Sequence, residues 1–287
     1  MSESRRRRTA LKFEAGGVRF RLGAETKLMG VLNVTPDSFS DGGKFLDPAL
    51  AELEALRLQD EGAHLLDIGG ESSRPGASAV PWREELARVR PVLKRIVPKL
   101  KIPVSVDTCK PEVAEAALDE GASVVNDITG LRANRRLAKL IASRGASVVI
   151  MHMRGTPRTM QNAPRYRDVV RDVKAALERS IGVAREAGIA KSRILIDPGF
   201  GFGKSFEHNF SLLSNLDEFA SLGYPVLVGL SRKSFLGNWL GLPVGERLQV
   251  SVSAAVAAIE RGAHVLRVHD VLAHRQAAAV ADRLLAS

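Results

Sequence analysis

The chain has 287 residues, of which 45% are hydrophobic, and a formal net charge of +10. This length and apolar content suit one domain with a sizeable core. The charge indicates anionic partners, but aromatic residues make up only 5% and no basic stripe is interleaved with them, which argues against nucleic acid. No apolar run has the length of a membrane span. We therefore expect a small phosphorylated ligand, with no nucleic acid or membrane as partner.

The cysteine content and the first residues bear on the cellular location. Cys109 is the only cysteine, so an intramolecular disulfide is excluded and a reducing compartment is favoured. The arginine cluster near the start is not followed by the apolar segment of a signal peptide. We predict a cytoplasmic enzyme. Cys109 itself is interpreted as a small packed thiol, with a nucleophile as the alternative.

The chain begins with a basic segment and a short repeat of alternating residues. Residues 1–9 are predicted to be a disordered tail, followed by a single domain over residues 10–287. Residues 11–23 form two alternating segments around Gly16-Gly17, which predicts a β-hairpin. We assign this hairpin to the amino-terminal end of a barrel, which it would cap.

Strand-like and helix-like segments alternate along the rest of the chain. Short apolar runs predict strands at 28–34, 64–70, 103–107, 123–127, 148–153, 193–199, 225–233 and 264–270. Amphipathic stretches predict helices at 48–62, 82–97, 111–121, 134–145, 167–188 and 246–262. This alternation is typical of a parallel α/β fold. Eight repeats favour closure into a (βα)8 TIM barrel over an open sheet.

Each predicted strand ends in a polar residue. These residues are Asn33, Asp67, Asp107, Asn126 with Asp127, His152, Asp197, Arg232 with Lys233, and Arg267 with His269 and Asp270. Catalytic groups of a (βα)8 barrel lie at the carboxyl ends of the strands. The sequence therefore predicts one active site that all eight strand ends face. For His152 we favour packing or hydrogen bonding over metal ligation.

Two loops after the first barrel strands have the composition of a lid. NVTPDSFSDGGKF begins at Asn33, and GGESSRPGASAV follows the second strand; both are rich in serine, proline and glycine. The first contains the apolar Phe39 and the second the charged Arg74. We interpret both as mobile loops that exclude water during the reaction. Plain surface turns are the alternative.

The segment DPGFGFGK, which begins at Asp197, is rich in glycine. Its spacing differs from that of a Walker loop, so we reject nucleoside triphosphate binding. A carboxylate at the barrel mouth is suited to accept hydrogen bonds from an amidine-like ring edge. Asp107 and Asn126 can add further contacts to the same edge. A helix cap is the alternative role for Asp107.

The last two strands predict a diphosphate pocket. Arg232 and Lys233 precede Ser234, which is placed to begin a helix whose N–H groups attract an anion. Arg267 and His269 are two residues apart and so lie on one side of a strand, at the position where barrels commonly bind phosphate. A purely structural Arg-x-His pair is the alternative. No spacing fits zinc, so we expect Mg²⁺ held largely by substrate phosphates.

These segments also resemble a known family. The chain is similar to dihydropteroate synthases, in order, at MGVLNVTPDSFSDGG, LDIGGESSRPGA, SVDTCKP, NDITG, IMHMRGTP, IDPGFGFGK, GLSRKSFLG and RVHD, over residues 29–270. The resemblance implies a transferase that joins p-aminobenzoate to 6-hydroxymethyl-7,8-dihydropterin diphosphate and releases diphosphate in folate synthesis. It also implies a sulfonamide target with Mg²⁺ as cofactor.

The resemblance assigns roles to individual residues. The pterin ring would be contacted by Asp107, Asn126, Asp197, Met151, Gly229 and Lys233. The diphosphate and Mg²⁺ would be held by Asn33, Arg267 and His269. The aminobenzoate would be surrounded by Phe39, Ser73, Arg74, Pro75, Phe202 and Ser234. Two residues depart from the family pattern: Ser73, where threonine is frequent, and Cys109, where serine is frequent.

We expect a dissociative mechanism. Diphosphate leaves first, assisted by Mg²⁺, Arg267 and His269, and the pterin stabilises a carbocation at the exocyclic methylene. The arylamine of p-aminobenzoate then attacks that carbon, so no enzyme nucleophile is needed. The carboxylate of the aminobenzoate is expected near Ser234 and the start of its helix.

Two other functions stay open. A methyltransferase on the same barrel would transfer a methyl group from a reduced folate to a corrinoid, but SFSDGG, SSRPG and SRKS argue against it. A catalytically silent protein would bind pterin without releasing diphosphate. Whatever the function, the alanine-rich helices at 251–262 and 277–286 predict that the barrel forms a homodimer.

Overall fold

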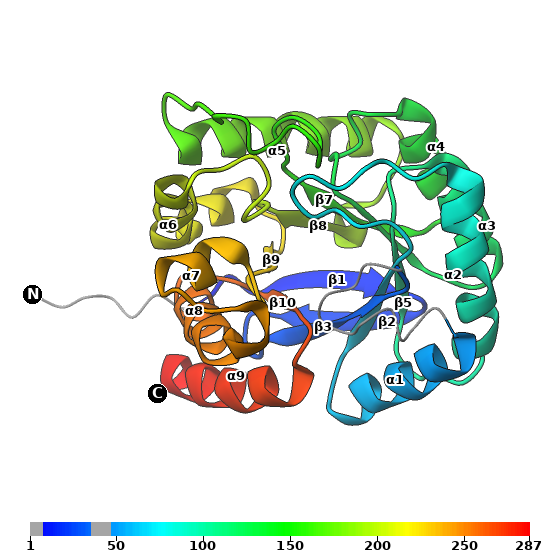
Figure 1. Cartoon of the computed structure of the whole chain (residues 1–287), viewed down its shortest axis with the longest axis horizontal. Helices are drawn as coiled ribbons and strands as arrows, with labels where there is room; N and C mark the ends of the chain where they lie inside the picture. Colours follow the sequence, from blue (N-terminus) through cyan, green and yellow to red (C-terminus); the bar gives the residue numbers. More distant parts are fainter. Residues whose placement is uncertain (1–7, 36–46) are drawn as a thin grey trace, which may run out of the picture.

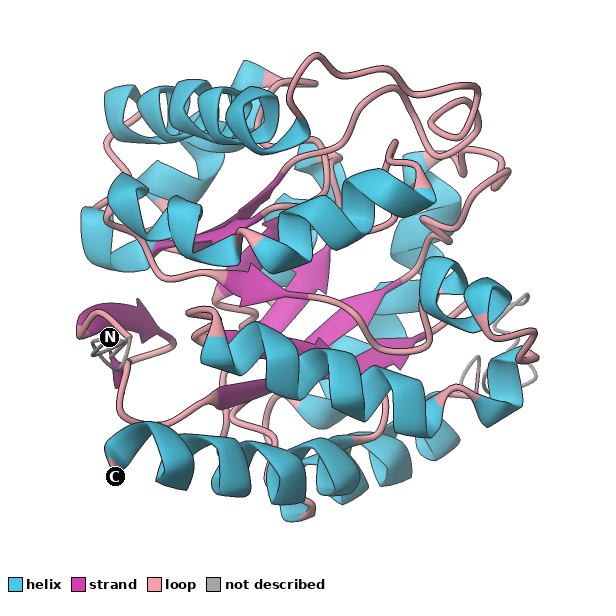
Figure 2. Cartoon of the chain, turned by 90° about the vertical axis from the view of Figure 1, so that its left-hand side faces the viewer, coloured by secondary structure: helices cyan, strands magenta, loops and turns pink. Residues whose placement is uncertain are grey.

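The computed structural model describes residues 8–35 and 47–287. The described residues form an eight-stranded parallel sheet in the order β8-β7-β6-β5-β4-β3-β10-β9. A further parallel bridge between Ile196 and Val226 joins the two ends of the sheet, which closes it into a barrel. Helices surround the strands (Figures 1 and 2). The predicted (βα)8 TIM-barrel fold is confirmed.

The barrel strands are short and almost wholly buried. Their bounds are β3 (Lys27–Asn33), β4 (Leu65–Gly69), β5 (Val104–Asp107), β6 (Val124–Asp127), β7 (Ser147–Met151), β8 (Ile194–Asp197), β9 (Leu227–Val228) and β10 (Val265–Val268). Burial on both faces explains their continuous apolar runs. The strand predicted over 225–233 is too long, because the chain leaves the β conformation after β9 and Arg232 has a φ of 58°.

All six predicted helices are present. The helices are α1 (Pro48–Asp60), α2 (Trp82–Ile96), α3 (Pro111–Asp119), α4 (Arg135–Ser143), α5 (Val169–Glu186), α6 (Phe206–Ser214), α7 (Ser234–Trp239), α8 (Leu248–Glu260) and α9 (Val271–Ala286), with 3₁₀ turns η2 (Lys191–Arg193), η3 (Leu216–Leu222) and η4 (Val244–Glu246). Helix α6 was not predicted; it begins at a capping box between Ser205 and His208. Within residues 8–35 and 47–287, none of the helices has both the length and the apolar character needed to span a bilayer.

The predicted hairpin closes one end of the barrel. It consists of β1 (Leu11–Ala15) and β2 (Val18–Leu22), which pair antiparallel. The Phe13 and Phe20 rings are 6.0 Å apart. The hairpin packs against the first inward-facing residues of the strands, and the whole cluster is Phe13, Ala15, Phe20, Leu22, Met29, Leu65, Val124, Val149, Leu195, Leu227 and Val265. The predicted capping role is confirmed.

The structure describes residues 8 and 9, which were predicted to belong to a disordered tail. Residues 1–7 lie outside the described part of the chain. The Arg8 side chain is 1% exposed and forms an ion pair of 2.5 Å with Asp282 on α9. It also donates to Thr26 Oγ1 at 2.6 Å. Arg8 therefore belongs to the folded domain, because a buried guanidinium needs the partners that α9 and the segment before β3 supply.

Candidate active site

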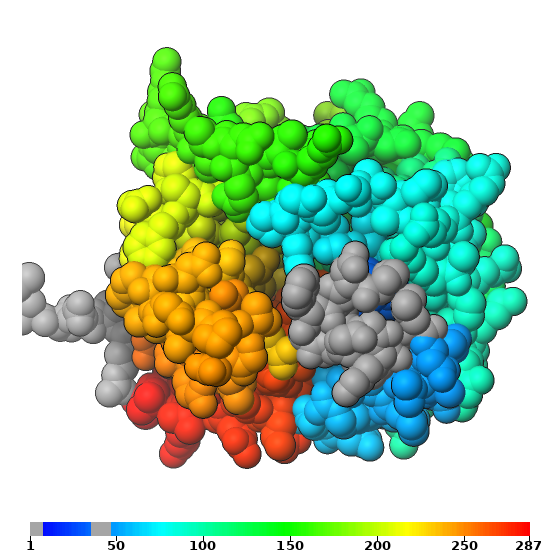
Figure 3. All heavy atoms as spheres, in the orientation of Figure 1, coloured from blue at the N-terminus to red at the C-terminus, as the bar shows by residue number. Residues whose placement is uncertain are grey.

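A cavity of about 360 Å³ lies at the carboxyl ends of the strands. The predicted site residues that line it are Asn33, Ser73, Arg74, Pro75, Asp107, Asn126, Met151, Asp197, Phe202, Gly229, Lys233, Ser234, Arg267 and His269. Phe39 lies outside the described residues. The cyan segment after β4 and the orange segment around α7 lie on the same face of the molecule in Figure 3. The fold thus brings together every described residue of the predicted site.

Strand register explains this convergence. Asn33 on β3 is level with Gly69 on β4, which is level with Asp107 on β5. Asp107 is level with Asn126 on β6. Because neighbouring parallel strands end at the same height, side chains distant in the sequence meet at one end of the barrel.

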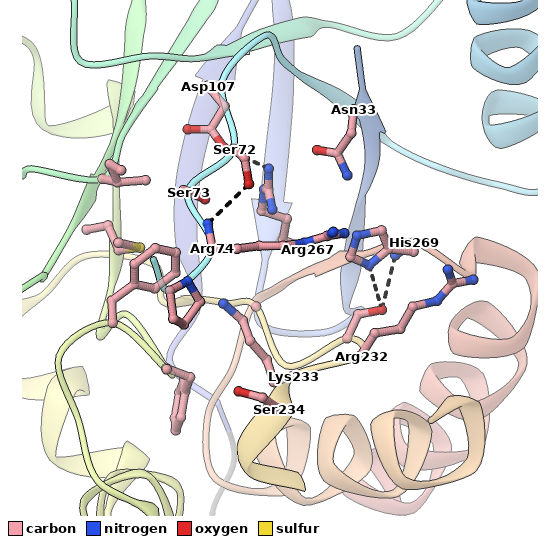
Figure 4. A pocket seen from close by; sticks show the side chains of 18 of the residues that line it. Asn33, Ser72, Ser73, Arg74, Asp107, Arg232, Lys233, Ser234, Arg267 and His269 are labelled. Atoms are coloured by element: carbon pink, nitrogen blue, oxygen red, sulfur yellow. Dashed lines mark hydrogen bonds and ion pairs between the residues drawn. The ribbon is translucent and has the colours of Figure 1, made fainter. Parts of the chain in front are cut away.

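Arg267 connects several of these side chains. Its Nη2 donates to Asp107 Oδ2 at 2.9 Å, and its Nε donates to Asp67 Oδ2 at 2.6 Å. The same Asp67 oxygen accepts from Asn126 Nδ2 at 2.9 Å. Figure 4 shows Asp107 and Arg267 beside the cavity, together with Asn33 and His269. Asp67, predicted only as a polar residue at a strand end, thus connects Arg267 with Asn126.

Burial changes the proton affinity of the two carboxylates that were assigned to the ring edge. It raises the pKa of Asp107 to about 7, although the nearby Arg267 acts in the opposite direction. It also raises the pKa of Asp197, against a hydrogen bond of 2.7 Å from the Gly199 N–H and the charge of Lys233. A ligand that donates hydrogen bonds to either carboxylate would favour its charged form and so offset part of the cost of burial.

Lys233 lies on the opposite wall, at the start of α7. Burial lowers the pKa of its ammonium group to about 8, while Asp197 opposes this change. Its Nζ lies 4.2 Å from the centre of the Phe202 ring, a cation–π distance. Ser234 is the first residue of α7, as predicted. This wall therefore combines an ammonium group, an aromatic ring and a helix start.

His269 lines the cavity and is hydrogen-bonded to Ser231. Its Nδ1 is 3.0 Å from Ser231 Oγ, which also accepts the backbone N–H of His269 at 3.2 Å. The serine hydroxyl has one donor and two acceptor sites, so it can donate to Nδ1 or accept from it. Burial, followed by the charges of Arg232 and Arg267, lowers the pKa of His269 well below its usual value.

The Arg232 side chain forms an ion pair with a carboxylate of the protein. Its Nε and Nη2 donate to the two carboxylate oxygens of Asp270, at 3.0 Å and 2.6 Å. Its backbone has a positive φ of 58°, and its N–H donates to Ser251 Oγ at 2.8 Å. Arg232 nevertheless lines the cavity, so its predicted contribution to a diphosphate pocket stays a prediction.

Lys204, the last residue of the segment DPGFGFGK, is buried. Its Nζ donates to the carbonyls of Gly199 at 2.8 Å and Phe202 at 3.0 Å, and lies 3.0 Å from His152 Nδ1. Burial lowers its pKa to about 7. The carbonyl oxygen of His152 approaches so closely that a side chain at Gly199 would clash with it. This packing holds the loop that carries Asp197, and it confirms the hydrogen-bonding role of His152.

The loop after β4 is fastened beside the cavity. Lys110 donates to Glu71 Oε2 at 2.7 Å and to the buried Glu85 Oε2 at 2.5 Å. Glu71 also accepts the Val80 N–H at 2.7 Å. These bonds fix both ends of the segment that contains Arg74. Movement of this loop as a lid stays a prediction, and most of the other predicted lid lies outside the described residues.

The structure bears on the alternative roles of Asp107 as a helix cap and of Cys109 as a nucleophile. The residue that caps α3 is Lys110, so the helix-cap alternative for Asp107 is wrong. Burial raises the pKa of Cys109 to about 12, so its thiol is protonated at neutral pH and unsuited to act as a nucleophile. Its interpretation as a packed thiol is supported.

The donor set fits Mg²⁺ only in combination with a phosphorylated ligand. Among the described residues, no group of three or more His, Cys, Asp or Glu side chains could hold a metal ion. Asn33 supplies an amide group at the cavity wall. Mg²⁺ commonly binds to one or two protein oxygens together with waters and substrate phosphates. The residues present are compatible with that mode of binding.

Comparison with known proteins identifies relatives along nearly the whole chain. The model of the family described as pterin binding enzyme matches residues 29–269. The dihydropteroate synthase of Escherichia coli (strain K12) is 46% identical over 260 residues, which cover 91% of this chain and 92% of the relative. The dihydropteroate synthase of Bacillus subtilis (strain 168) is 43% identical over 263 residues, which cover 91% of this chain and 89% of the relative.

Solved structures agree with these relatives. The Yersinia pestis dihydropteroate synthase, solved with a sulfonamide drug complex, has a TM-score of 0.93 and 41% identity, covering 96% of this chain and 100% of that chain. The Xanthomonas albilineans enzyme in complex with 7,8-dihydropteroate has a TM-score of 0.85 and 44% identity, covering 96% and 99%. The chain therefore belongs to the dihydropteroate synthase family of pterin-binding enzymes.

Proposed function

We propose that the protein joins 6-hydroxymethyl-7,8-dihydropterin diphosphate to p-aminobenzoate, giving 7,8-dihydropteroate and diphosphate in folate biosynthesis. The observation that carries the proposal is a single cavity that combines a carboxylate and amide wall with an Arg267–His269 wall. The first wall complements the hydrogen-bond donors of a pterin, and the second complements a diphosphate. The names of the relatives and the dihydropteroate complex of the Xanthomonas enzyme support the same reaction.

The pterin ring binds deepest in this proposal. Asp107 and Asp197 accept hydrogen bonds from its N–H groups, and Asn126 contributes an amide that can donate or accept. Met151 lines one side of the cavity, and Gly229 leaves room for the flat ring on another. Lys233 approaches the ring from the start of α7. These residues orient the exocyclic methylene carbon toward the mouth of the cavity.

The leaving diphosphate lies beside β10. Arg267 and His269 both line the cavity, and they would donate to the diphosphate from the nitrogens that Asp67, Asp107 and Ser231 do not occupy. The C–O bond breaks first, both its electrons leave with the diphosphate, and the pterin stabilises the cation at the methylene carbon. Mg²⁺, held by Asn33 and the phosphates, would neutralise part of the leaving-group charge. Chelation with EDTA is expected to slow diphosphate release, and added Mg²⁺ to restore it.

The aminobenzoate binds last, above the pterin. Its arylamine nitrogen attacks the methylene carbon and then loses a proton. Ser234 and the start of α7 lie where its carboxylate would bind, on the same side as Phe202. The remaining walls are assigned to Ser73, Arg74, Pro75 and, outside the described residues, Phe39. The 4-aminobenzoic acid complex of the Xanthomonas albilineans relative supports this second substrate.

The decisive test is diphosphate release from the dihydropterin diphosphate with Mg²⁺, in the presence and absence of p-aminobenzoate. We expect release that depends on p-aminobenzoate, with dihydropteroate identified by mass. Pterin binding without release would instead support the catalytically silent protein. The corrinoid methyltransferase reading is overturned by the identity of the relatives.

The predicted homodimer and cytoplasmic location remain part of the proposal. Support for the dimer comes from α9, where Leu272, Val280 and Leu284 are exposed apolar residues. The spacing of eight and four positions places the three side chains on one face of α9, which packs against α8. Light scattering is expected to give twice the chain mass. The location is supported by the single cysteine, which favours a reducing compartment.

A further inference from the structure

Asp67 is buried between the two walls of the cavity. It lies in the middle of β4, its side chain is fully buried, and it is absent from the described lining of the cavity. Its Oδ2 accepts one hydrogen bond from Arg267 Nε on β10 and another from Asn126 Nδ2 on β6. These two partners do line the cavity. A single buried oxygen thus connects one residue of the diphosphate wall with one residue of the pterin wall.

The two carboxylates that hold Arg267 differ in their access to a ligand. Asp107 lines the cavity, and 12% of its side chain is exposed. Asp67 is 0% exposed. A pterin ring can therefore compete with Arg267 for the Asp107 carboxylate, whereas it cannot reach Asp67. When Asp107 turns to the ring, Asp67 is the partner that keeps Arg267 in place.

We propose that Asp67 is a positioning residue that fixes Arg267 and Asn126 relative to each other, and so sets the distance between the bound diphosphate and the bound pterin ring. This inference rests on the proposed function and deepens it. Asp67 touches no substrate. It acts because charge-assisted hydrogen bonds from Nε and Nδ2 leave each partner one orientation, with its remaining donors directed into the cavity.

Truncation of Asp67 should weaken two ligands that it does not contact. In Asp67→Ala, Arg267 keeps only Asp107 as its anionic partner, and the Asn126 amide loses its acceptor. We expect the Kd of 6-hydroxymethylpterin, a probe of the ring alone, and that of inorganic diphosphate with Mg²⁺ each to rise about tenfold or more. We expect kcat to fall as well, because Arg267 no longer meets the leaving group in a fixed position.

Ser105 provides a matched control. It is the register partner of Asp67 on the neighbouring strand β5 and is equally buried. Its Oγ has no hydrogen-bond partner among the described residues. Ser105→Ala therefore truncates a polar side chain at the same level of the barrel without removing such a contact. Both probes should bind this variant with Kd values within about twofold of the wild type.

A conservative replacement separates positioning from a general effect on stability. In Asp67→Asn, the amide oxygen can take the place of Oδ2 and accept from Asn126, so we expect pterin affinity to recover to within about threefold of wild type. A purely structural role would lower the melting temperature and the active fraction but leave the Kd of the folded fraction unchanged. If Asp67→Ala fails to fold, Asp67→Leu fills the volume and carries the same expectation for both probes.

The measurements separate this inference from the proposed function. Wild-type protein that binds neither probe would overturn both. Wild-type protein that binds both, with Asp67→Ala or Asp67→Leu binding them equally well, would overturn the role of Asp67 alone. An equal loss of affinity in Ser105→Ala would also overturn it, because the effect would then belong to the barrel interior in general.

Discussion

The two ends of the barrel interior are built from the same strands but contain opposite chemistry. Near the amino-terminal end, Met29 on β3 and Leu65 on β4 pack against the hairpin residue Phe13. Toward the carboxyl end, the same two strands carry Asn33 and Asp67. One strand thus contributes to a dry core at one end and to a polar site at the other. The apolar end stabilises the barrel and can offset the free-energy cost of burying charged groups at the other end.

Burial has different consequences at the two ends. At the hairpin end it removes apolar surface from water, which stabilises the fold. At the cavity end it raises the pKa of Asp197 and lowers that of Lys233 to about 8, because each charged form is less favourable away from water. Groups that cost stability are the ones that a ligand of opposite hydrogen-bonding character can satisfy. Substitutions at the two ends should therefore separate stability from binding.

The largest expected effect is on stability, at the hairpin end. Phe13→Ala removes a ring that is 1% exposed and stacks on Phe20, so it should lower the free energy of unfolding by about 3–5 kcal/mol. Chemical denaturation measures this change. The folded fraction should keep its kcat/KM, because the cavity lies at the other end. Val18→Ala is the control, since Val18 belongs to the same hairpin but is 37% exposed. A comparable loss in the control would remove the distinction.

The next effect concerns binding, at the cavity end. Asp197→Ala removes a carboxylate that is proposed to bind the pterin edge, and the Kd of 6-hydroxymethylpterin should rise by about 100-fold or more through the loss of charged hydrogen bonds. Calorimetric titration measures it. The free energy of unfolding should change less than in Phe13→Ala, because the ionised Asp197 is itself unfavourable when buried. Unchanged pterin affinity would remove Asp197 from the site.

These two ends also differ in how far the sequence predicts them. The polar residues at strand ends predicted the site because β strands end level with one another, as the Gly69 to Asp107 register illustrates. The sequence could not predict that Arg267 pairs with Asp107, since pairing depends on side-chain directions across the barrel. Nor could it predict that Arg232 pairs with Asp270. The backbone of Arg232 has a positive φ there, which a non-glycine residue rarely adopts.

The hairpin end was easier to predict in outline than in detail. Alternation around Gly16-Gly17 predicted both strands of the hairpin, because alternation follows directly from the strand period. The boundary of the domain was placed too late, since the burial of Arg8 depends on Asp282, which is 274 residues further along the chain. Helix α6 was missed for a local reason: its sequence, FEHNFSLLS, has few charged residues to mark a polar face.

A smaller effect should appear as a pH dependence that only the cavity end can produce. The pKa of Asp107 is raised to about 7 in the ligand-free protein. Above this pH the carboxylate is ionised and accepts hydrogen bonds from the pterin; below it, the group is protonated and must first lose its proton. The Kd of 6-hydroxymethylpterin should therefore rise about tenfold per pH unit below 7. Asp107→Asn should lose the change centred near pH 7, and any pH dependence that is left would belong to Asp197 and Lys233. A flat wild-type profile from about pH 5 to 7 would contradict this prediction, because it is what an unshifted carboxyl group gives.

The smallest effect tests whether position near the site is enough to make a residue functional. Cys109 lies just after β5, two residues beyond Asp107, yet it is absent from the described lining of the cavity. Its raised pKa, about 12, keeps the thiol protonated, and the proposed reaction needs no enzyme nucleophile. Cys109→Ser should therefore keep kcat/KM within about twofold of wild type. The native protein should react slowly with a thiol reagent at pH 8 and rapidly once it is unfolded. Substantial loss of activity in this variant would contradict the prediction, because it would show that a residue of the loop after β5, outside the cavity wall, is needed for the reaction.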